Sequence, residues 1–216
     1  MRAFLRLLLF KEYQYRDTVL SGIKRWYEKQ LILEQVSRTG KNLDIVIGPK
    51  KSYIFRAGNA KINIGDDVKI YSPIEITAST HIFPDCVVEI GDRTHIGPYS
   101  AIRAAKGVTI GRDCLLASYV KLFDYNGHPI RPGSYDNMET LRNRSRTPPE
   151  EVANIRVGDN VWIGENSIIQ RGVTIGQGSV VSANSVVIKD VPENTVVFGS
   201  PARAILWLDK NGRAEK

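Results

Sequence analysis

Aliphatic residues recur at every sixth position over long stretches of this chain. The C-terminal run consists of Val157, Ile163, Ile169, Ile175, Val181 and Val187. The same spacing occurs in three earlier blocks, which are Ile64, Ile70, Ile76 and Ile82, then Ile90, Ile96 and Ile102, and then Ile110, Leu116 and Leu122. A helix cannot use this period, because six residues rotate by about 600° and carry the apolar side chains around its surface.

The residues around each repeat position predict a short strand followed by a corner. Glycine often follows the aliphatic residue, as in Ile163-Gly164, where a tight turn needs a permissive backbone. Three such units close a triangular coil with its aliphatic side chains inside, and coils stack about 4.8 Å apart. A sandwich or barrel would instead alternate every two residues. The pattern predicts an all-β solenoid, a parallel β-helix.

The repeat also divides the chain. Residues 1–58 lack it and are predicted to be a mainly helical extension, residues 59–205 form the β-helix, and residues 206–216 are a tail. Regular spacing stops at Leu122 and resumes at Val157, so residues 123–156 are predicted to leave the coil as a loop. A long excursion from a rigid scaffold is commonly functional.

The composition bears on the cellular compartment and on the possible partners. Only Cys86 and Cys114 occur, four residues after Ile82 and Ile110, which places them in a small inward slot and predicts core thiols rather than disulfides. Two cysteines are too few for a disulfide framework, which favours a reducing cytoplasm. The first residues are followed by no cleavage site, and no run of about 18 apolar residues predicts a membrane span. The net charge of +7 permits anionic partners, but no motif supports nucleic acid.

The N-terminal extension carries much of this charge. Between Met1 and Lys41 nine basic residues face four acidic ones, interspersed with leucine, isoleucine, tyrosine and tryptophan. Such a helical segment could cap the open end of the solenoid, because solenoid ends need covering. It could also lie on an anionic membrane at the inner face of the cell. Both interpretations stay open.

Several motifs resemble a known family over residues 60–205. They are Val161-Trp162-Ile163-Gly164, Lys189-Asp190-Val191-Pro192 and Gly199-Ser200-Pro201-Ala202-Arg203. Together with the tandem repeats they are similar to the hexapeptide-repeat acyltransferases, in the O-acetyltransferase branch that includes maltose, galactoside and polysaccharide acetyltransferases. The resemblance implies a left-handed β-helix and a homotrimer that binds acetyl-CoA between neighbouring prisms.

The same resemblance implies where the cofactor binds. Gly164 and Ala183 would line the pantetheine arm, with the small Ser182 allowing a close approach to the backbone. Lys189 and Arg203 would meet the phosphates, although most basic side chains on a surface are simply solvated. No metal is expected.

The predicted loop opens with Phe123-Asp124-Tyr125-Asn126-Gly127-His128-Pro129. This segment is similar to the Asp-x-Asp-x-His-Pro stretch of sugar O-acetyltransferases, which implies that His128 is the general base and that Asp124 orients its imidazole. The second acidic position of the family is Asn126 here, so its role is in doubt. Asn126 and Arg131 are weaker candidates for contacts with the acceptor. A histidine base suits this chemistry because a sugar hydroxyl is a poor nucleophile at neutral pH.

The predicted function is therefore transfer of an acetyl group from acetyl-CoA to a hydroxyl of a sugar, a surface polysaccharide or a lipid-linked glycan. Transfer to an amine of an amino sugar or amino acid is an alternative, because loop residues choose the acceptor. A non-catalytic scaffold is another. A zinc-dependent carbonic anhydrase on the same fold is disfavoured, because only His81, His95 and His128 occur and the closely spaced ligand pair is missing.

Overall fold

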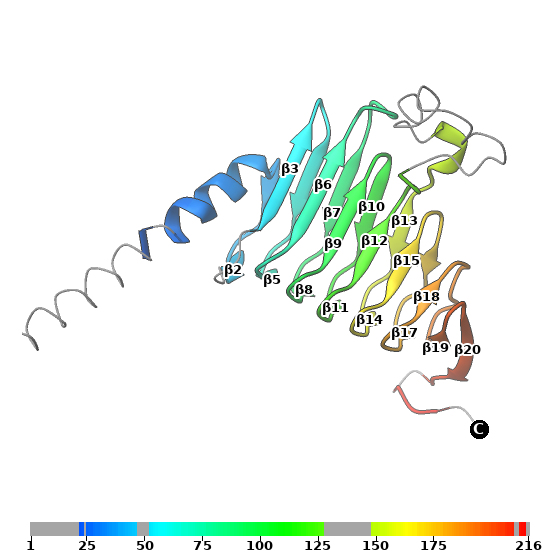
Figure 1. Ribbon diagram of the computed structural model, residues 1–216. Helices are drawn as coiled ribbons and strands as arrows, with labels where there is room; N and C mark the ends of the chain where they lie inside the picture. The colour runs from blue at the N-terminus through cyan, green and yellow to red at the C-terminus, as the bar shows by residue number, and fades with distance from the viewer. Residues whose placement is uncertain (1–21, 24, 47–51, 128–147, 210–211, 215–216) are drawn as a thin grey trace, which may run out of the picture.

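The computed structural model describes residues 22–23, 25–46, 52–127, 148–209 and 212–214. Short strands follow one another along the chain, and from β1 to β18 every third strand joins the same sheet. Three sheets therefore form the walls of a prism whose coils stack along one axis (Figure 1). The predicted parallel β-helix is confirmed.

Each wall is a ladder of strands from successive coils. Sheet A contains β1 (Arg38–Thr39), β4 (Lys61–Ile64), β7 (Val87–Ile90), β10 (Gly107–Ile110), β13 (Ile155–Val157) and β16 (Thr174–Ile175). Sheet B contains β2 (Asp44–Val46), β5 (Lys69–Tyr71), β8 (His95–Ile96), β11 (Leu115–Leu116), β14 (Trp162–Ile163), β17 (Val180–Val181), β19 (Thr195–Gly199) and β20 (Ala202–Trp207). Sheet C contains β3 (Tyr53–Ala57), β6 (Glu75–Ser79), β9 (Ala101–Ala104), β12 (Lys121–Phe123), β15 (Ile168–Gln170) and β18 (Val186–Val187). Neighbouring strands are parallel, except that β20 closes sheet B antiparallel to β19.

The core follows the six-residue repeat. In sheet A the pairing stacks Ile64 on Ile90, Ile90 on Ile110 and Ile110 on Val157, and each of these side chains is at most 3% exposed. Equivalent positions of every coil thus meet inside the prism, where burial of apolar surface stabilises the stack. Ile82 differs from the predicted pattern, because it lies half-buried in the connection between β6 and β7.

Both cysteines lie inside the prism, as the spacing predicts. Cys86 is 0% exposed and Cys114 is 2% exposed. Burial disfavours the thiolate and raises the pKa of Cys86 to about 11, and it raises the pKa of Cys114 as well. Neither thiol is therefore prepared for nucleophilic chemistry.

The prism begins earlier than the predicted boundary at residue 59. Strands β1, β2 and β3 all precede that position and pair with β4, β5 and β6. Ile45 and Ile54 supply the inward side chains of this first coil. Ile45 and Ile54 are nine residues apart, so the six-residue spacing does not reveal this coil.

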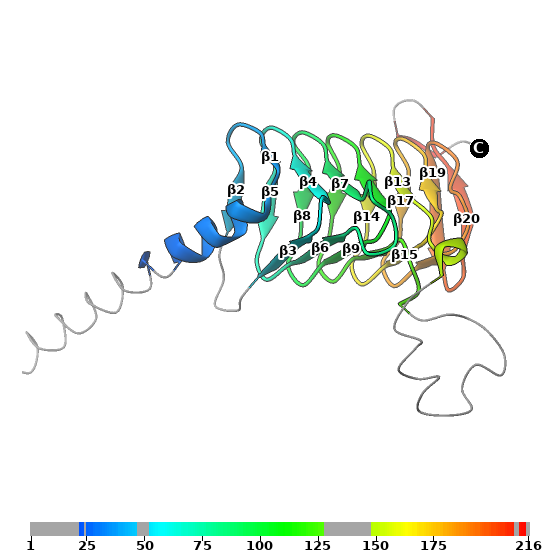
Figure 2. The ribbon, with the colours of Figure 1, turned by 90° about the horizontal axis from the view of Figure 1, so that it is seen from above.

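A helix formed by residues 22–23 and 25–35 precedes the first coil. Only its last part contacts the prism: Ile32 is 6% exposed and belongs to the core, and Leu33 and Val36 pack against it. The earlier part of the helix extends away from the coils (Figure 2). The helix therefore caps the prism with its C-terminal end alone.

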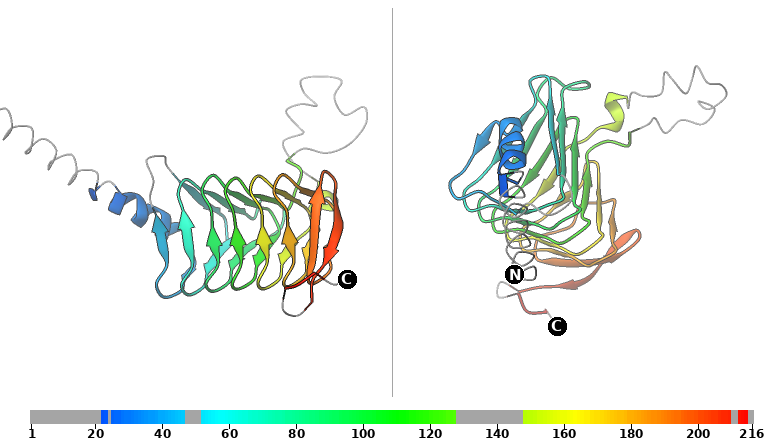
Figure 3. Two further views of the ribbon diagram at one scale, coloured as in Figure 1. Left: turned by 90° about the horizontal axis from the view of Figure 1, so that it is seen from below. Right: turned by 60° about the vertical axis from the view of Figure 1, so that its left-hand side comes forward.

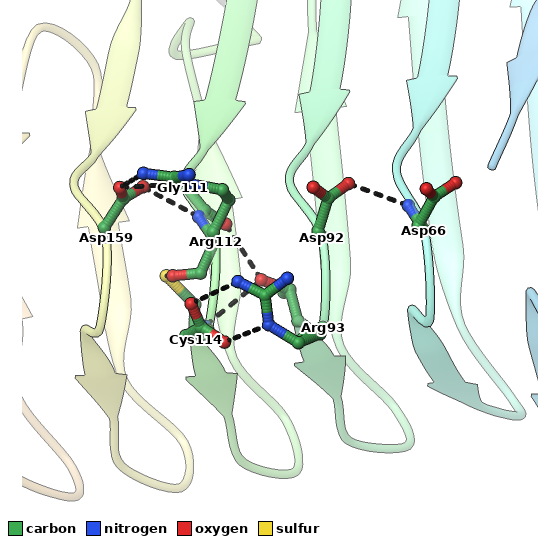
Figure 4. Close-up of polar contacts among 9 residues, drawn as sticks. Asp66, Asp92, Arg93, Gly111, Arg112, Cys114 and Asp159 are labelled. Atoms are coloured by element: carbon green, nitrogen blue, oxygen red, sulfur yellow. Dashed lines mark hydrogen bonds and ion pairs between the residues drawn. The ribbon is translucent and has the colours of Figure 1, made fainter. Parts of the chain in front are cut away.

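The edge between sheets A and B, here called the tight edge, has short and regular corners. Asp159 Oδ1 accepts a hydrogen bond of 2.8 Å from the Arg112 main-chain nitrogen, and the Arg112 guanidinium lies 2.7 Å from Asp159 Oδ2. One coil away, Arg93 forms an ion pair of 2.6 Å with Asp113 (Figure 4). These arginines lower the pKa of Asp113 and Asp159. The side chains join successive coils.

The edge between sheets C and A, here called the variable edge, has connections of very different length. Residues 58–60 link β3 to β4, residues 80–86 link β6 to β7, and residues 105–106 link β9 to β10. Residues 124–154 link β12 to β13, and their described part includes the 3-10 helix η1 (Pro149–Glu151). This helix stands outside the prism wall (Figure 3). The predicted excursion therefore leaves from this edge.

Candidate functional site

Asp124 is the first residue of the excursion and is completely buried. Its Oδ1 accepts a hydrogen bond of 2.8 Å from the main-chain nitrogen of Ala105. Its Oδ2 accepts bonds of 2.8 Å and 2.7 Å from the main-chain nitrogens of Lys106 and Gly107. The carboxylate thereby fixes the start of the excursion to the corner of the preceding coil.

Two opposing effects act on this carboxylate. Burial, the larger effect, raises the pKa of Asp124, while the three main-chain N–H donors favour its charged form and lower the pKa. The donors all come from the prism, so the side chain acts as an anchor in the described part of the chain. Its predicted second role, orienting His128, stays a prediction.

The two limbs of the excursion are joined near this anchor. Tyr125 forms an antiparallel bridge with Val152, and the Ala153 main-chain nitrogen donates 3.0 Å to the Asp124 carbonyl. Asn126 Nδ2 lies 3.4 Å from Glu151 Oε2. Asn126, predicted to contact the acceptor, thus bonds to the returning limb. The base of the excursion is a defined structure.

His128 and Arg131 lie outside the described residues. The described chain reaches Gly127, the residue directly before His128. The described chain therefore ends at the variable edge, beside Asp124 and Tyr125, one residue before the predicted catalytic histidine.

Three predicted cofactor residues lie together at the edge between sheets B and C. A Cβ on Gly164 would lie 2.5 Å from the Ala183 main-chain nitrogen, so the close stacking of two corners already requires glycine there. Ser182 is half-buried, and its main-chain nitrogen donates 2.9 Å to Val197. Ala183 is exposed. Cofactor contact at these residues stays a prediction.

The two predicted phosphate ligands lie apart from one another. Arg203, on β20, pairs with Phe198 of β19, and β19 pairs with the strand that leads into Ser182. Lys189 follows β18 and is exposed at the variable edge. Within a single chain, Arg203 therefore lies toward Gly164, Ser182 and Ala183, whereas Lys189 lies on another edge of the prism.

The rest of the described surface contains a groove but no candidate metal site. Among the described residues no group of three histidine, cysteine or acidic side chains could hold a metal ion. A groove of about 340 Å³ lies over sheet A beside Arg38, Asn63 and Glu89, and none of the predicted site residues lines it.

The sequence pattern did not single out the side chains beside the base of the excursion. The His81 ring meets the Tyr125 ring edge-on, with centroids 6.4 Å apart. The Lys106 ammonium lies 4.9 Å from the centre of the Phe83 ring. The spacing gave no clear signal, because Ile82 continues the six-residue pattern into this connection and the step from Ile102 to Ile110, also eight residues, spans a short corner.

Comparisons with known proteins agree with this architecture. A family model described as the hexapeptide repeat of succinyl-transferase matches residues 87–118 and 154–189. The putative lipopolysaccharide biosynthesis O-acetyl transferase WbbJ of Escherichia coli is 38% identical over 123 residues, which are 55% of this chain and 60% of WbbJ. The galactoside O-acetyltransferase of Escherichia coli is 41% identical over 98 residues, 45% of this chain and 43% of that enzyme. The chain thus spans about half the length of these curated relatives.

A solved structure extends the comparison. The hexapeptide-repeat acetyltransferase of Vibrio cholerae O1 biovar eltor, complexed with acetyl-coenzyme A, aligns with a TM-score of 0.52 and 26% identity over 84% of this chain and 76% of that one. The coils and the matched repeats define a β-helical protein built from hexapeptide units. Over the matched residues the chain is similar to hexapeptide-repeat acetyltransferases.

Proposed function

We propose that this protein transfers an acetyl group from acetyl-CoA to a hydroxyl of a sugar or glycan, with His128 as general base. The observation that carries the proposal is the base of the excursion, where a buried carboxylate fixes the chain four residues before this histidine. The names of the relatives support the reaction class, because WbbJ and the galactoside enzyme are both described as O-acetyl transferases.

The chemistry requires a base at a fixed place. His128 would remove the hydroxyl proton as the oxygen attacks the thioester carbonyl, and such assistance is worth about 10²- to 10⁴-fold. Asp124 would hold the start of the loop and favour the imidazolium through its charge. Transfer to an amine needs less help from a base, so the presence of this histidine favours a hydroxyl acceptor.

The cofactor proposal rests on the last coils. Acetyl-CoA would contact Gly164, Ser182 and Ala183 along one edge and Arg203 at its end. Lys189 lies on another edge of the same chain, so its predicted phosphate contact fits best if a second prism lies alongside, as in a homotrimer. The Vibrio cholerae relative, solved with acetyl-coenzyme A, supports this choice of donor.

The test is release of free CoA thiol from acetyl-CoA with a panel of sugars, nucleotide sugars, glycan fragments and amino sugars. We expect acceptor-dependent release that falls at least about 10²-fold in His128→Ala. His95→Ala, on β8 of sheet B, is the matched control and should keep its activity. Release that survives His128→Ala overturns the assignment of the base. A product acetylated on nitrogen would favour the amine alternative, and no release with any acceptor would favour a scaffold.

We also propose that the N-terminal helix contacts an anionic membrane at the cytoplasmic face. Its free part exposes Ile23 by 58%, Trp26 by 63% and Tyr27 by 57%, while Arg25 and Lys29 lie on the same segment. Aromatic and aliphatic side chains beside basic ones are typical of helices that lie in the membrane interface. Among the described residues no helix is long and apolar enough to cross a membrane.

Liposome co-sedimentation tests this contact. The intact protein should bind vesicles containing phosphatidylglycerol and not pure phosphatidylcholine, and Trp26→Ser with Tyr27→Ser should lose most of the bound fraction. Trp162→Ser, a similarly exposed tryptophan on β14, is the control. Equal binding by all variants overturns the proposal. The proposal is also overturned if the intact protein binds no vesicles and the double variant Trp26→Ser/Tyr27→Ser loses its oligomeric state.

A further inference from the structure

Four side chains from three successive coils form two contacting pairs at the variable edge. His81 and Phe83 come from the connection between β6 and β7, Lys106 from the corner between β9 and β10, and Tyr125 from the base of the excursion. We call these residues the edge cluster. His81 contacts Tyr125, and Lys106 contacts Phe83.

Asp124 joins the two contacts into one cluster. Its Oδ2 accepts the main-chain hydrogen bond of Lys106 at 2.8 Å, and Tyr125 is its neighbour in the chain. The edge cluster therefore lies directly beside Gly127, where the described chain ends before His128.

We propose that the edge cluster binds a pyranose ring of the acceptor, with His81 as a positioning residue. This inference rests on the proposed sugar acetyltransferase function and adds a binding site to it. A sugar ring presents an apolar C–H face and a rim of hydroxyls, so its site combines aromatic rings with polar side chains. Phe83 and Tyr125 provide the rings, and His81 and Lys106 provide the polar groups.

The geometry of His81 suits this role. Its Nδ1 lies 2.8 Å from the Ser79 hydroxyl, which holds the ring in place. The side chain is exposed, so Nε2 is the ring nitrogen that can exchange a hydrogen bond with a sugar hydroxyl. The charges nearby favour neither an anionic nor a cationic ligand. Arg103 is neutralised by Glu75 at 2.7 Å, and the acidic Asp85 lies in the same loop as His81. A ring with hydroxyls, rather than an acidic group, is the ligand that these residues fit.

Steady-state kinetics of CoA release give the first test. We expect His81→Ala to raise the KM for the sugar acceptor about tenfold, the effect of one lost hydrogen bond of about 1.4 kcal/mol, and to leave the KM for acetyl-CoA unchanged. His81→Gln, whose amide can reach the position of Nε2, should recover part of this loss. His95→Ala is the control. An unchanged acceptor KM in His81→Ala, with turnover intact, overturns the edge cluster while the proposed function stands.

A binding measurement does not depend on turnover. Saturation-transfer NMR with the methyl pyranosides of glucose, galactose and N-acetylglucosamine should give a signal with at least one sugar for the wild type and His95→Ala. His81→Ala and Lys106→Gln should reduce that signal at least about threefold. Binding without acetyl transfer would support the edge cluster and contradict the proposed function. Equal signals from wild type and His81→Ala, or no signal from any sugar, would overturn the edge cluster.

Discussion

The tight edge and the variable edge belong to the same coils, yet they differ in almost every local feature. At the tight edge each corner repeats the last, and its aspartates and arginines bond to neighbouring corners. At the variable edge the connections range in length from residues 105–106 to residues 124–154, and their side chains include the buried Asp124 carboxylate and the half-buried rings of Phe83 and Tyr125. The polar groups at the first edge join the coils, whereas those at the second hold and surround an excursion.

The difference teaches where a solenoid can carry function. Every coil needs its inward aliphatic residues, because each stacks on the next. A corner can lengthen only if the strands on both sides keep their register, as β12 and β13 do on either side of the excursion. A lengthened corner also needs new hydrogen bonds. The Asp124 carboxylate supplies them here, because it accepts from three main-chain donors of the neighbouring corner.

The largest effect on stability is expected at the tight edge. In Gly111→Ala the new Cβ would lie 2.7 Å from the Gly158 carbonyl carbon and against Asp159 Oδ1, so the coils would have to separate. We expect a loss of about 3 kcal/mol in the free energy of unfolding, measured by urea denaturation. Gly22→Ala, on the helix and with nothing within 4 Å of its Cβ, is the control and should be neutral or slightly stabilising. An unchanged midpoint in Gly111→Ala would contradict this account of the stacked corners.

The next effect separates the two roles of Asp124. Asp124→Asn keeps the shape but offers one acceptor oxygen in place of two, so we expect a loss of about 2 kcal/mol in the free energy of unfolding. Asp85→Asn, an exposed aspartate on the same edge, is the control and should change little. If Asp124 also pairs with His128, the pH profile of CoA release will shift toward lower pH in Asp124→Asn. A destabilised variant with an unshifted profile would leave Asp124 as an anchor only.

The smallest effect is expected from the ion pairs of the tight edge. Asp159→Asn keeps the Oδ1 acceptor and removes the charge that faces Arg112, which should change the Tm at pH 7 by about 2 °C or less. The pKa of Asp159 is lowered in the folded protein, so its contribution is present above the unfolded pKa and is lost as the pH falls through the folded value. The Tm difference between the variant and the wild type should therefore vanish in acid. A difference that grows below about pH 4 would contradict the sign of this shift.

Much of the fold could be predicted because its determinant is local and repeated. Ile163, Ile169 and Ile175 each occupy an equivalent inward position, so one spacing rule places them all. The first coil escaped this rule, because its inward residues Ile45 and Ile54 are nine residues apart. Ile82 obeyed the spacing and still lies outside the core, since the corner after β6 lengthens there.

The candidate site was only partly accessible to sequence reasoning. The break after Leu122 marked the excursion, and the Asp124 to His128 segment within it resembles that of known sugar O-acetyltransferases. No spacing, however, connects Asp124 with the main chain of residues 105–107, or His81 with Tyr125. These contacts join residues from different coils, and their partners depend on which corners share an edge of the prism.

The sequence by itself determined the repeat, the inward aliphatic residues and the place where the coil breaks, because each follows from a period that a short segment already displays. The tertiary structure alone decided that the corner at residues 80–86 and the base of the excursion share one edge, and that the helix covers the prism only with its last turn. The physical reason is stacking: residues a full coil apart become neighbours only when the strands between them have closed the triangle.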